Sequence, residues 1–171
     1  MWVDLLKILI PSLLVFLAGY LALRAMVKND ASRRRTELAF SNDKITLPLK
    51  LQAYERLILF LERISPESII IRVTQKGMLA SDLHTAILAN IRAEWEHNLS
   101  QQLYVSNEAW EMVKNAKENI TKLINICSDK IVANDSALDL SQTILETYSS
   151  LDVNPTNLAI DFLKKEVKDF L

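Results

Sequence analysis

Apolar positions along the chain form one continuous run at the start and several periodic segments after it. The run ILIPSLLVFLAGYLAL, residues 8–23, contains no charged residue. As a helix it would be about 24 Å long at about 1.5 Å per residue. Extension to residues 5–27 reaches the roughly 30 Å of a bilayer core, because Lys7 and Arg24 lie near the ends and can extend to the headgroups. This pattern predicts a transmembrane anchor over residues 1–28.

The residues that flank the apolar run favour an anchor over two alternatives. A cleaved signal peptide would have a basic start and a small-residue cleavage site, whereas here the basic cluster follows the run. A buried core helix would rarely be free of charge on all sides and then followed by three arginines. The positive-inside rule predicts a single span with the N-terminus outside and residues 28–171 in the cytoplasm.

Basic residues beside the span either contact anionic lipid headgroups or only set its orientation. Residues 1–35 carry six basic residues and two acids, a charge of +4, while the remainder carries 14 and 19, a charge of -5. The candidate headgroup contacts are Arg24, Lys28, Arg33, Arg34 and Arg35. A mildly acidic remainder argues against nucleic acid as a partner.

Beyond a polar linker at residues 29–46, the spacing of apolar residues is helical. The expected helices cover residues 47–64, 82–103, 106–131, 135–150 and 154–171, with starts at Pro48, Ser81 or Asp82, Ser106, Asp135 and Asn154-Pro155. The predicted fold class is therefore all-α: one N-terminal transmembrane helix followed by a cytoplasmic bundle of about five helices, over residues 47–171. Only IIIRVT, residues 69–74, fits a short helix and a strand equally well, because it is β-branched.

The segment from Asn107 to Ile131 repeats apolar residues at alternating gaps of three and four. The repeating positions are Ala109, Val113, Ala116, Ile120, Leu123, Cys127 and Ile131. Such spacing is typical of a seam in a helical bundle or a coiled coil, within one chain or between two copies. Cys127, the only cysteine, is expected to be a buried thiol on this seam.

Polar residues form a stripe beside the apolar face of the helix that begins near Asp82. Asn90, Glu94, His97 and Gln101 share this stripe at spacings of four, three and four. Asn98 and Gln102 project into the apolar face, so we expect each to form hydrogen bonds with a neighbouring helix. A second polar strip contains Glu55 and Arg56, repeated seven residues later as Glu62 and Arg63. The stripe, Asn98, Gln102, Glu55 and Arg56 are the candidate interaction residues, although the strip is also ordinary for a solvated helix surface.

Glu94-x-x-His97 has the spacing that di-iron bundles use, but those sites need a second copy. The other histidine, His84, has Ser81 three residues before it, so no second copy exists. A single metal held by Glu94, His97 and an outside acid (Glu55, Glu62 or Glu146) stays an alternative. We assign no catalytic or cofactor-binding residue and expect no cofactor. With only Gly19 and Gly77, the chain cannot form a glycine-rich phosphate loop, which excludes nucleotide binding of that kind.

Two segments, LPLKLQAYERLILFLERI at 47–64 and EWEHNLSQQLYVSNEAW at 94–110, carry a resemblance that covers roughly the middle half of the chain. They resemble an uncharacterised family of short Gram-negative bacterial proteins with one N-terminal membrane span and a helical cytoplasmic domain. The resemblance implies a single-pass protein of the bacterial inner membrane with a periplasmic N-terminus. It carries over no activity and no functional residue.

Together these features predict a membrane-anchored, non-catalytic interaction or scaffold protein, such as an accessory subunit of an inner-membrane complex. The expected partners are the lipid bilayer and other membrane-complex proteins, or a second copy through the seam, with no nucleic acid or nucleotide. The alternative is a membrane-tethered enzyme that uses a single metal or the acid–base chemistry of His97 and Glu94.

Overall fold

The computed structural model describes residues 2, 13, 16–21, 23–24, 26, 44 and 46–170. The chain divides into two compact units, Met1–Leu47 and Pro48–Leu171. In the first unit, the described residues up to 26, Arg24 among them, are helical and exposed. Among the residues that can be described, no helix is long and apolar enough to span a membrane. Most of the predicted anchor lies outside these residues, as do Lys28, Arg33, Arg34 and Arg35, so the anchor stays a prediction.

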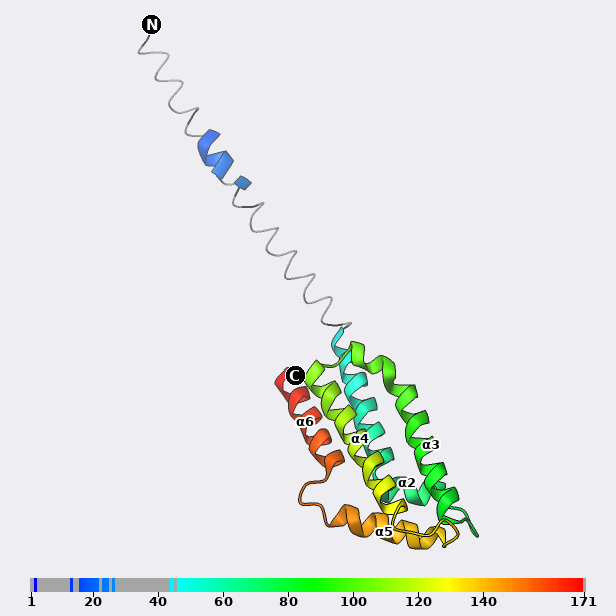
Figure 1. The fold of residues 1–171 in the computed structure, drawn as a ribbon. Coiled ribbons are helices and arrows are strands. Elements are labelled where there is room, and N and C mark those ends of the chain that lie inside the picture. Colours follow the sequence, from blue (N-terminus) through cyan, green and yellow to red (C-terminus); the bar gives the residue numbers. More distant parts are fainter. Residues whose placement is uncertain are drawn as a thin grey trace. The chain divides into compact units, whose positions relative to one another are not determined.

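The second unit is built from helices, which confirms the all-α prediction for the part that the structure describes. The elements are the helix over 46–64, α2 (Pro66–Val73), α3 (Ala80–Asn98), the 3-10 helix η1 (Leu99–Leu103), α4 (Asn107–Ser128), α5 (Ala137–Ser149) and α6 (Pro155–Phe170) (Figure 1). An isolated antiparallel bridge joins Leu79 to Ser136, in the loops before α3 and α5. Compared with the five expected helices, the described domain gains α2, and the end of the helix expected over 82–103 becomes η1.

The segment at 69–74, which fitted either a helix or a strand, is helical. Pro66 occupies the first turn of α2, where its missing N–H is not needed. Ile69 and Ile70 are buried, whereas Ile71 is 83% exposed. Burial of one face of a helix therefore outweighs the β-branched preference for strands. Thr74 ends α2 with an extended backbone, and its hydroxyl donates to the Ile70 carbonyl at 2.6 Å.

Helix starts are set by short-range signals, and three of them differ from the prediction. Ser106 caps α4 as expected, with its Oγ accepting from the Ala109 N–H at 2.9 Å, and α6 begins at Pro155. The third helix begins at Ala80 instead, because Asp82 reaches back and accepts from the Leu79 N–H. The cap of α5 is Ser136, not Asp135, since the Ser136 Oγ accepts from the Leu138 N–H at 3.1 Å. Pro48 does not open its helix, because 46 and 47 are already helical and proline is tolerated in a first turn.

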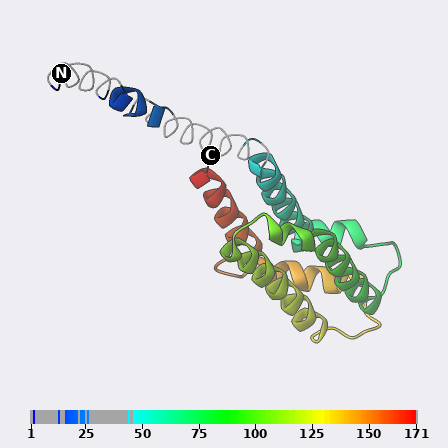
Figure 2. The ribbon, with the colours of Figure 1, turned by 90° about the horizontal axis from the view of Figure 1, so that it is seen from above.

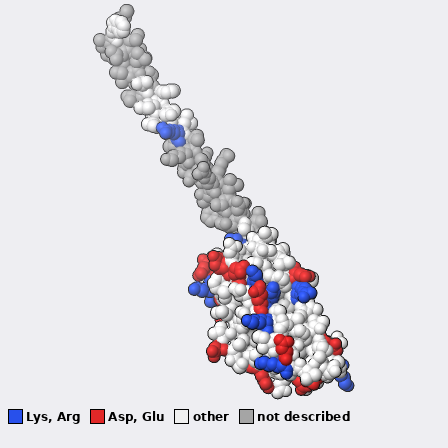
Figure 3. Space-filling view, in the orientation of Figure 1, with Lys and Arg blue, Asp and Glu red and all other residues white. Residues whose placement is uncertain are grey.

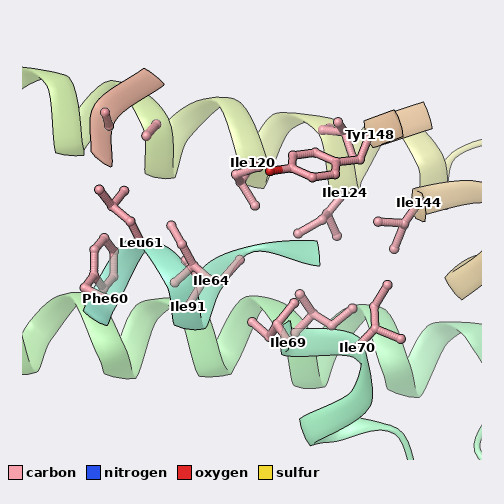
Figure 4. Packing of buried hydrophobic residues seen from close by; sticks show 14 of the residues in the cluster. Phe60, Leu61, Ile64, Ile69, Ile70, Ile91, Ile120, Ile124, Ile144 and Tyr148 are labelled. Atoms are coloured by element: carbon pink, nitrogen blue, oxygen red, sulfur yellow. The ribbon is translucent and has the colours of Figure 1, made fainter. Parts of the chain in front are cut away.

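The helix over 46–64, α3, α4 and α6 run alongside one another, and α5 lies across one end of this group (Figures 1 and 2). Helix α4 packs along α6, and α5 contacts α2, α3 and α4. The core fills the space that these helices enclose. Its side chains point toward one another from five helices: Phe60, Leu61, Ile64, Ile69, Ile70, Ile91, Ile120, Ile124, Ile144 and Tyr148 (Figure 4).

The seam of α4 packs inside this chain. Its residues from Ala109 to Cys127 are at most 8% exposed, and all belong to the single core cluster. Ile131 lies beyond the end of α4 and is half-buried. Cys127 is a buried thiol, as expected, and its Sγ donates to the Thr143 carbonyl on α5 at 3.8 Å. The seam residues from Ala109 to Cys127 therefore pack against the chain's own helices.

A buried pair of hydroxyl groups joins α5 to α6. The Tyr148 Oη and Thr156 Oγ1 atoms lie 2.7 Å apart, and the two residues are 2% and 1% exposed. Burial raises the pKa of the Tyr148 phenol above its ordinary value of 10.0, and the negative charges of Glu67 and Glu62 add to this, while the hydrogen bond with Thr156 lowers it. The folded state therefore holds the Tyr148 proton more tightly than the unfolded chain does.

We expect the free energy of unfolding to fall as the pH rises above about 10. Above that value the unfolded chain loses the Tyr148 proton while the folded protein keeps it, so ionisation stabilises the unfolded state. Urea unfolding of the full chain at a series of pH values from about 8 to 11 measures this slope. Burial also raises the pKa of Tyr54, so Tyr148→Phe should make the fall shallower without abolishing it. If the free energy of unfolding of Tyr148→Phe fell with pH as steeply as that of the unaltered chain, Tyr148 would not be the group responsible.

Candidate functional site

A groove of about 290 Å³ lies between the helix over 46–64 and α3. It is lined by Arg56, Leu59, Phe60, Arg63, Asn90, Ala93, Glu94, His97 and Asn98. The groove therefore brings together Arg56 from the predicted strip and four of the six predicted polar residues of the third helix. Its volume lies at the lower end of the range for small-ligand sites, so it has room for one or two side chains rather than for a large cofactor.

Glu94 is held between two arginines from two different helices. Its Oε2 atom accepts from Arg63 at 3.3 Å and its Oε1 atom from Arg72 of α2 at 3.4 Å. Arg72 also donates to the Asn90 Oδ1 atom at 2.6 Å and to the Arg63 carbonyl at 3.1 Å. The Glu94 side chain is only 18% exposed, whereas those of Arg63 and Arg72 are 58% and 33% exposed. Exposed ion pairs contribute little to stability, so these contacts mainly fix the positions of the groups.

Arg56 and His97 lie next to each other along the groove. The Arg56 guanidinium donates to the His97 carbonyl at 3.5 Å, a long hydrogen bond. The His97 Nδ1 atom lies 2.6 Å from the Ala93 carbonyl, one turn earlier on α3. Because a carbonyl only accepts, Nδ1 carries a proton and Nε2 is the free acceptor when the ring is neutral. The Arg56 guanidinium is thus held less firmly than that of Arg72.

Aromatic side chains from three neighbouring helices pack against one another next to the groove. Phe60, which lines the groove, packs on Trp95 with ring centroids 5.6 Å apart. Trp95 stacks on Trp110 at 4.7 Å, and the Lys117 ammonium lies 4.7 Å from the Trp95 ring. Such offset and cation–π contacts fix ring positions. The apolar side of the groove is therefore preorganised, while its arginines are partly exposed.

The predicted interhelical hydrogen bonds of Asn98 and Gln102 are wrong. The Asn98 amide donates to the Glu94 carbonyl at 2.8 Å and the Gln102 amide to the Leu99 carbonyl at 2.9 Å, both within their own helical turns. Gln101, expected on the boundary, is instead 8% exposed, and Gln102 is exposed. The cause is the change to a 3-10 helix at Leu99, because that helix turns about 120° per residue rather than 100°. The added rotation turns Gln101 inward and Gln102 outward.

The part of the chain that the structure describes does not assemble the alternative metal site. Within the described ranges, no group of three or more His, Cys, Asp or Glu side chains could hold a metal ion. Both Glu94 oxygens accept from guanidinium groups, which a cation would have to displace. Of the outside acids proposed as ligands, Glu55 and Glu62 are exposed and do not line the groove, and Glu146 accepts from Gln142 on α5. Glu94 is thus a partner for arginine in this arrangement.

Arg63 and Arg72 were not among the predicted interaction residues, although both hold Glu94. Arg63 had been placed in the repeat of the polar strip, and its position seven residues after Arg56, on the same side of the helix, was the signal that could have added it. Arg72 could not have been found, since it belongs to the segment 69–74, which the sequence did not assign to either a helix or a strand. Over the face of the domain that Figure 3 shows, positive and negative side chains are mixed.

The sequence model of a family of unknown function (DUF7935) matches residues 1–170. This match covers the predicted anchor segment, the linker and the helical domain together. No curated protein and no solved structure matches the chain.

Proposed function

The chain belongs to the DUF7935 family of unknown function, whose model it matches over residues 1–170, and from this we propose what the protein does. We propose that it is a membrane-anchored, non-catalytic interaction protein, an accessory subunit of a bacterial inner-membrane complex. In this proposal the apolar N-terminal segment anchors the chain. The cytoplasmic helical domain then presents the groove between the helix over 46–64 and α3 to a partner protein.

The observation that carries this proposal is the arginine cluster around Glu94. Arg63 and Arg72 come from two helices and converge on one carboxylate beside an open groove. Leu59, at the same groove, is 54% exposed and lies beside this polar cluster. Exposed apolar side chains rimmed by fixed polar groups are typical of protein-binding surfaces.

Two sequence features support the anchor. The uncharged run at residues 8–23 and the basic residues that follow it have the order expected for a span with the N-terminus in the periplasm and the domain in the cytoplasm. Among the basic residues, Arg24, Lys28, Arg33, Arg34 and Arg35 are proposed to lie at the headgroups of the cytoplasmic leaflet. The anchor would hold the groove within reach of other membrane-complex proteins.

Photocrosslinking in intact cells tests the proposal. A benzophenone amino acid in place of Leu59 should give one defined adduct in the membrane fraction, which should resist a carbonate wash. The same amino acid in place of Leu138, which is 71% exposed on α5, is the matched control and should give none. Release of the chain by carbonate would contradict the anchor. Equal adducts from both positions, or none from position 59, would contradict the docking surface.

A further inference from the structure

The groove carries more positive than negative charge. Arg56 and Arg63 line it against one carboxylate, that of Glu94, and Arg72 adds a third guanidinium to the same cluster. Arg72 donates three hydrogen bonds, to Glu94, Asn90 and the Arg63 carbonyl. Among the residues that the structure describes, Arg56 has one long bond, to a backbone carbonyl, and the Arg63 side chain is 58% exposed. Arg56 and Arg63 are therefore the groups with hydrogen-bonding capacity to offer a partner.

The positions of Arg56 and Arg63 define the spacing of the groups that they can bind. They lie seven residues apart on one helix, or about 10.5 Å along its axis at about 1.5 Å per residue. Leu59 lies between them at the groove and is 54% exposed. A second helix laid along the first would place side chains seven positions apart at the same spacing, with another side chain near the midpoint. Guanidinium groups bind carboxylates with charge-assisted hydrogen bonds.

We propose, resting on the function proposed above, that the groove binds a helix of a partner protein that carries carboxylates at positions i and i+7 and an apolar residue at i+4. The two carboxylates bind Arg56 and Arg63, and the apolar side chain packs on Leu59 and Phe60. Glu94 acts as an internal competitor, because it occupies Arg63 in the unbound protein. Arg72 keeps its bonds to Asn90 and to the Arg63 carbonyl when Glu94 is displaced.

Fluorescence anisotropy with synthetic peptides tests this proposal on the full chain in detergent micelles. The probe is a labelled alanine-rich helix with Glu at i and i+7 and Leu at i+4. A peptide with Gln in place of both Glu residues should bind at least about tenfold more weakly, since the loss of charge-assisted bonds changes affinity by about that factor per 1.4 kcal/mol. A peptide with Glu at i and i+5, on different sides of the helix, should also bind more weakly.

Variants of the protein separate the groove from general charge effects. Arg56→Ala and Arg63→Ala should each weaken binding of the i, i+7 peptide at least about fivefold. Arg92→Ala is the matched control, because Arg92 is exposed on α3, one of the two helices that form the groove, but does not line the groove. Glu94→Gln should tighten binding, a gain that a misfolded variant would not produce.

Equal binding of the Glu and Gln peptides would overturn the proposal. So would an Arg92→Ala loss as large as that of Arg63→Ala, or weaker binding by Glu94→Gln. If an extended peptide with Glu at i and i+3 bound more strongly than the helical i, i+7 peptide, the proposal that the partner segment is a helix would be wrong. These outcomes are distinct from failure of the proposed function, because a crosslink from position 59 can form with a partner that carries no such acids.

Discussion

Replacement of Phe60 by alanine is expected to lower the free energy of unfolding by about 3 to 5 kcal/mol. Phe60 is 1% exposed and packs on Trp95, which in turn stacks on Trp110. The substitution would leave a cavity where three helices meet and would remove an aromatic pair worth about 0.5 to 1.5 kcal/mol beyond its buried area. Urea unfolding of the full chain, followed by far-UV circular dichroism, measures the loss.

The neighbouring residue supplies the matched control for this prediction. Leu59→Ala also removes a large apolar side chain, from the preceding position of the same helix, but Leu59 is 54% exposed. Leu59→Ala should therefore lower the free energy of unfolding by at most about 1 kcal/mol. Similar losses in the two variants would mean that the helix faces the core with a different side, and would contradict both the packing and the groove. Leu59→Ala should also weaken binding of the acidic helix, so the two variants separate the fold from the proposed site.

The sequence predicted the elements whose signals are local. Ser106 caps α4 and Pro155 opens α6 because a cap or a proline needs only its own turn. The seam of α4 was found for the same reason, since its spacing of three and four depends on one helix alone. The α2 segment was left open, because the burial of Ile69 and Ile70 that decides it comes from helices distant in the sequence.

The candidate site was predicted only in part, for a different physical reason. The stripe of Asn90, Glu94 and His97 follows from the helical period, and the structure places all three at the groove. That Arg72 reaches Glu94 depends on how α2 and α3 pack, a long-range property that periodicity does not contain. Gln101 is buried and Gln102 is exposed, the reverse of the prediction. The reason is the 3-10 helix at Leu99–Leu103, because the prediction assumed the 100° rotation per residue of an α-helix.

Replacement of Ile120 by alanine is expected to lower the free energy of unfolding by about 2 to 5 kcal/mol. Ile120 is fully buried in the seam of α4, among core residues of the same chain. Ile126→Ala is the control, because this isoleucine lies on the same helix but is 43% exposed, and it should cost at most about 1 kcal/mol. Urea unfolding curves of both variants and of the unaltered chain give the comparison.

The same experiment at several protein concentrations distinguishes packing within the chain from association. If the seam packs within one chain, the unfolding midpoint of the unaltered protein and the loss in Ile120→Ala are both independent of concentration. If the seam joined two copies, folding would be coupled to association, and the midpoint would rise with concentration by mass action. A concentration-independent loss would leave partner binding to the exposed surfaces of the domain, which include the arginine-lined groove where Arg63 already binds a carboxylate, that of Glu94.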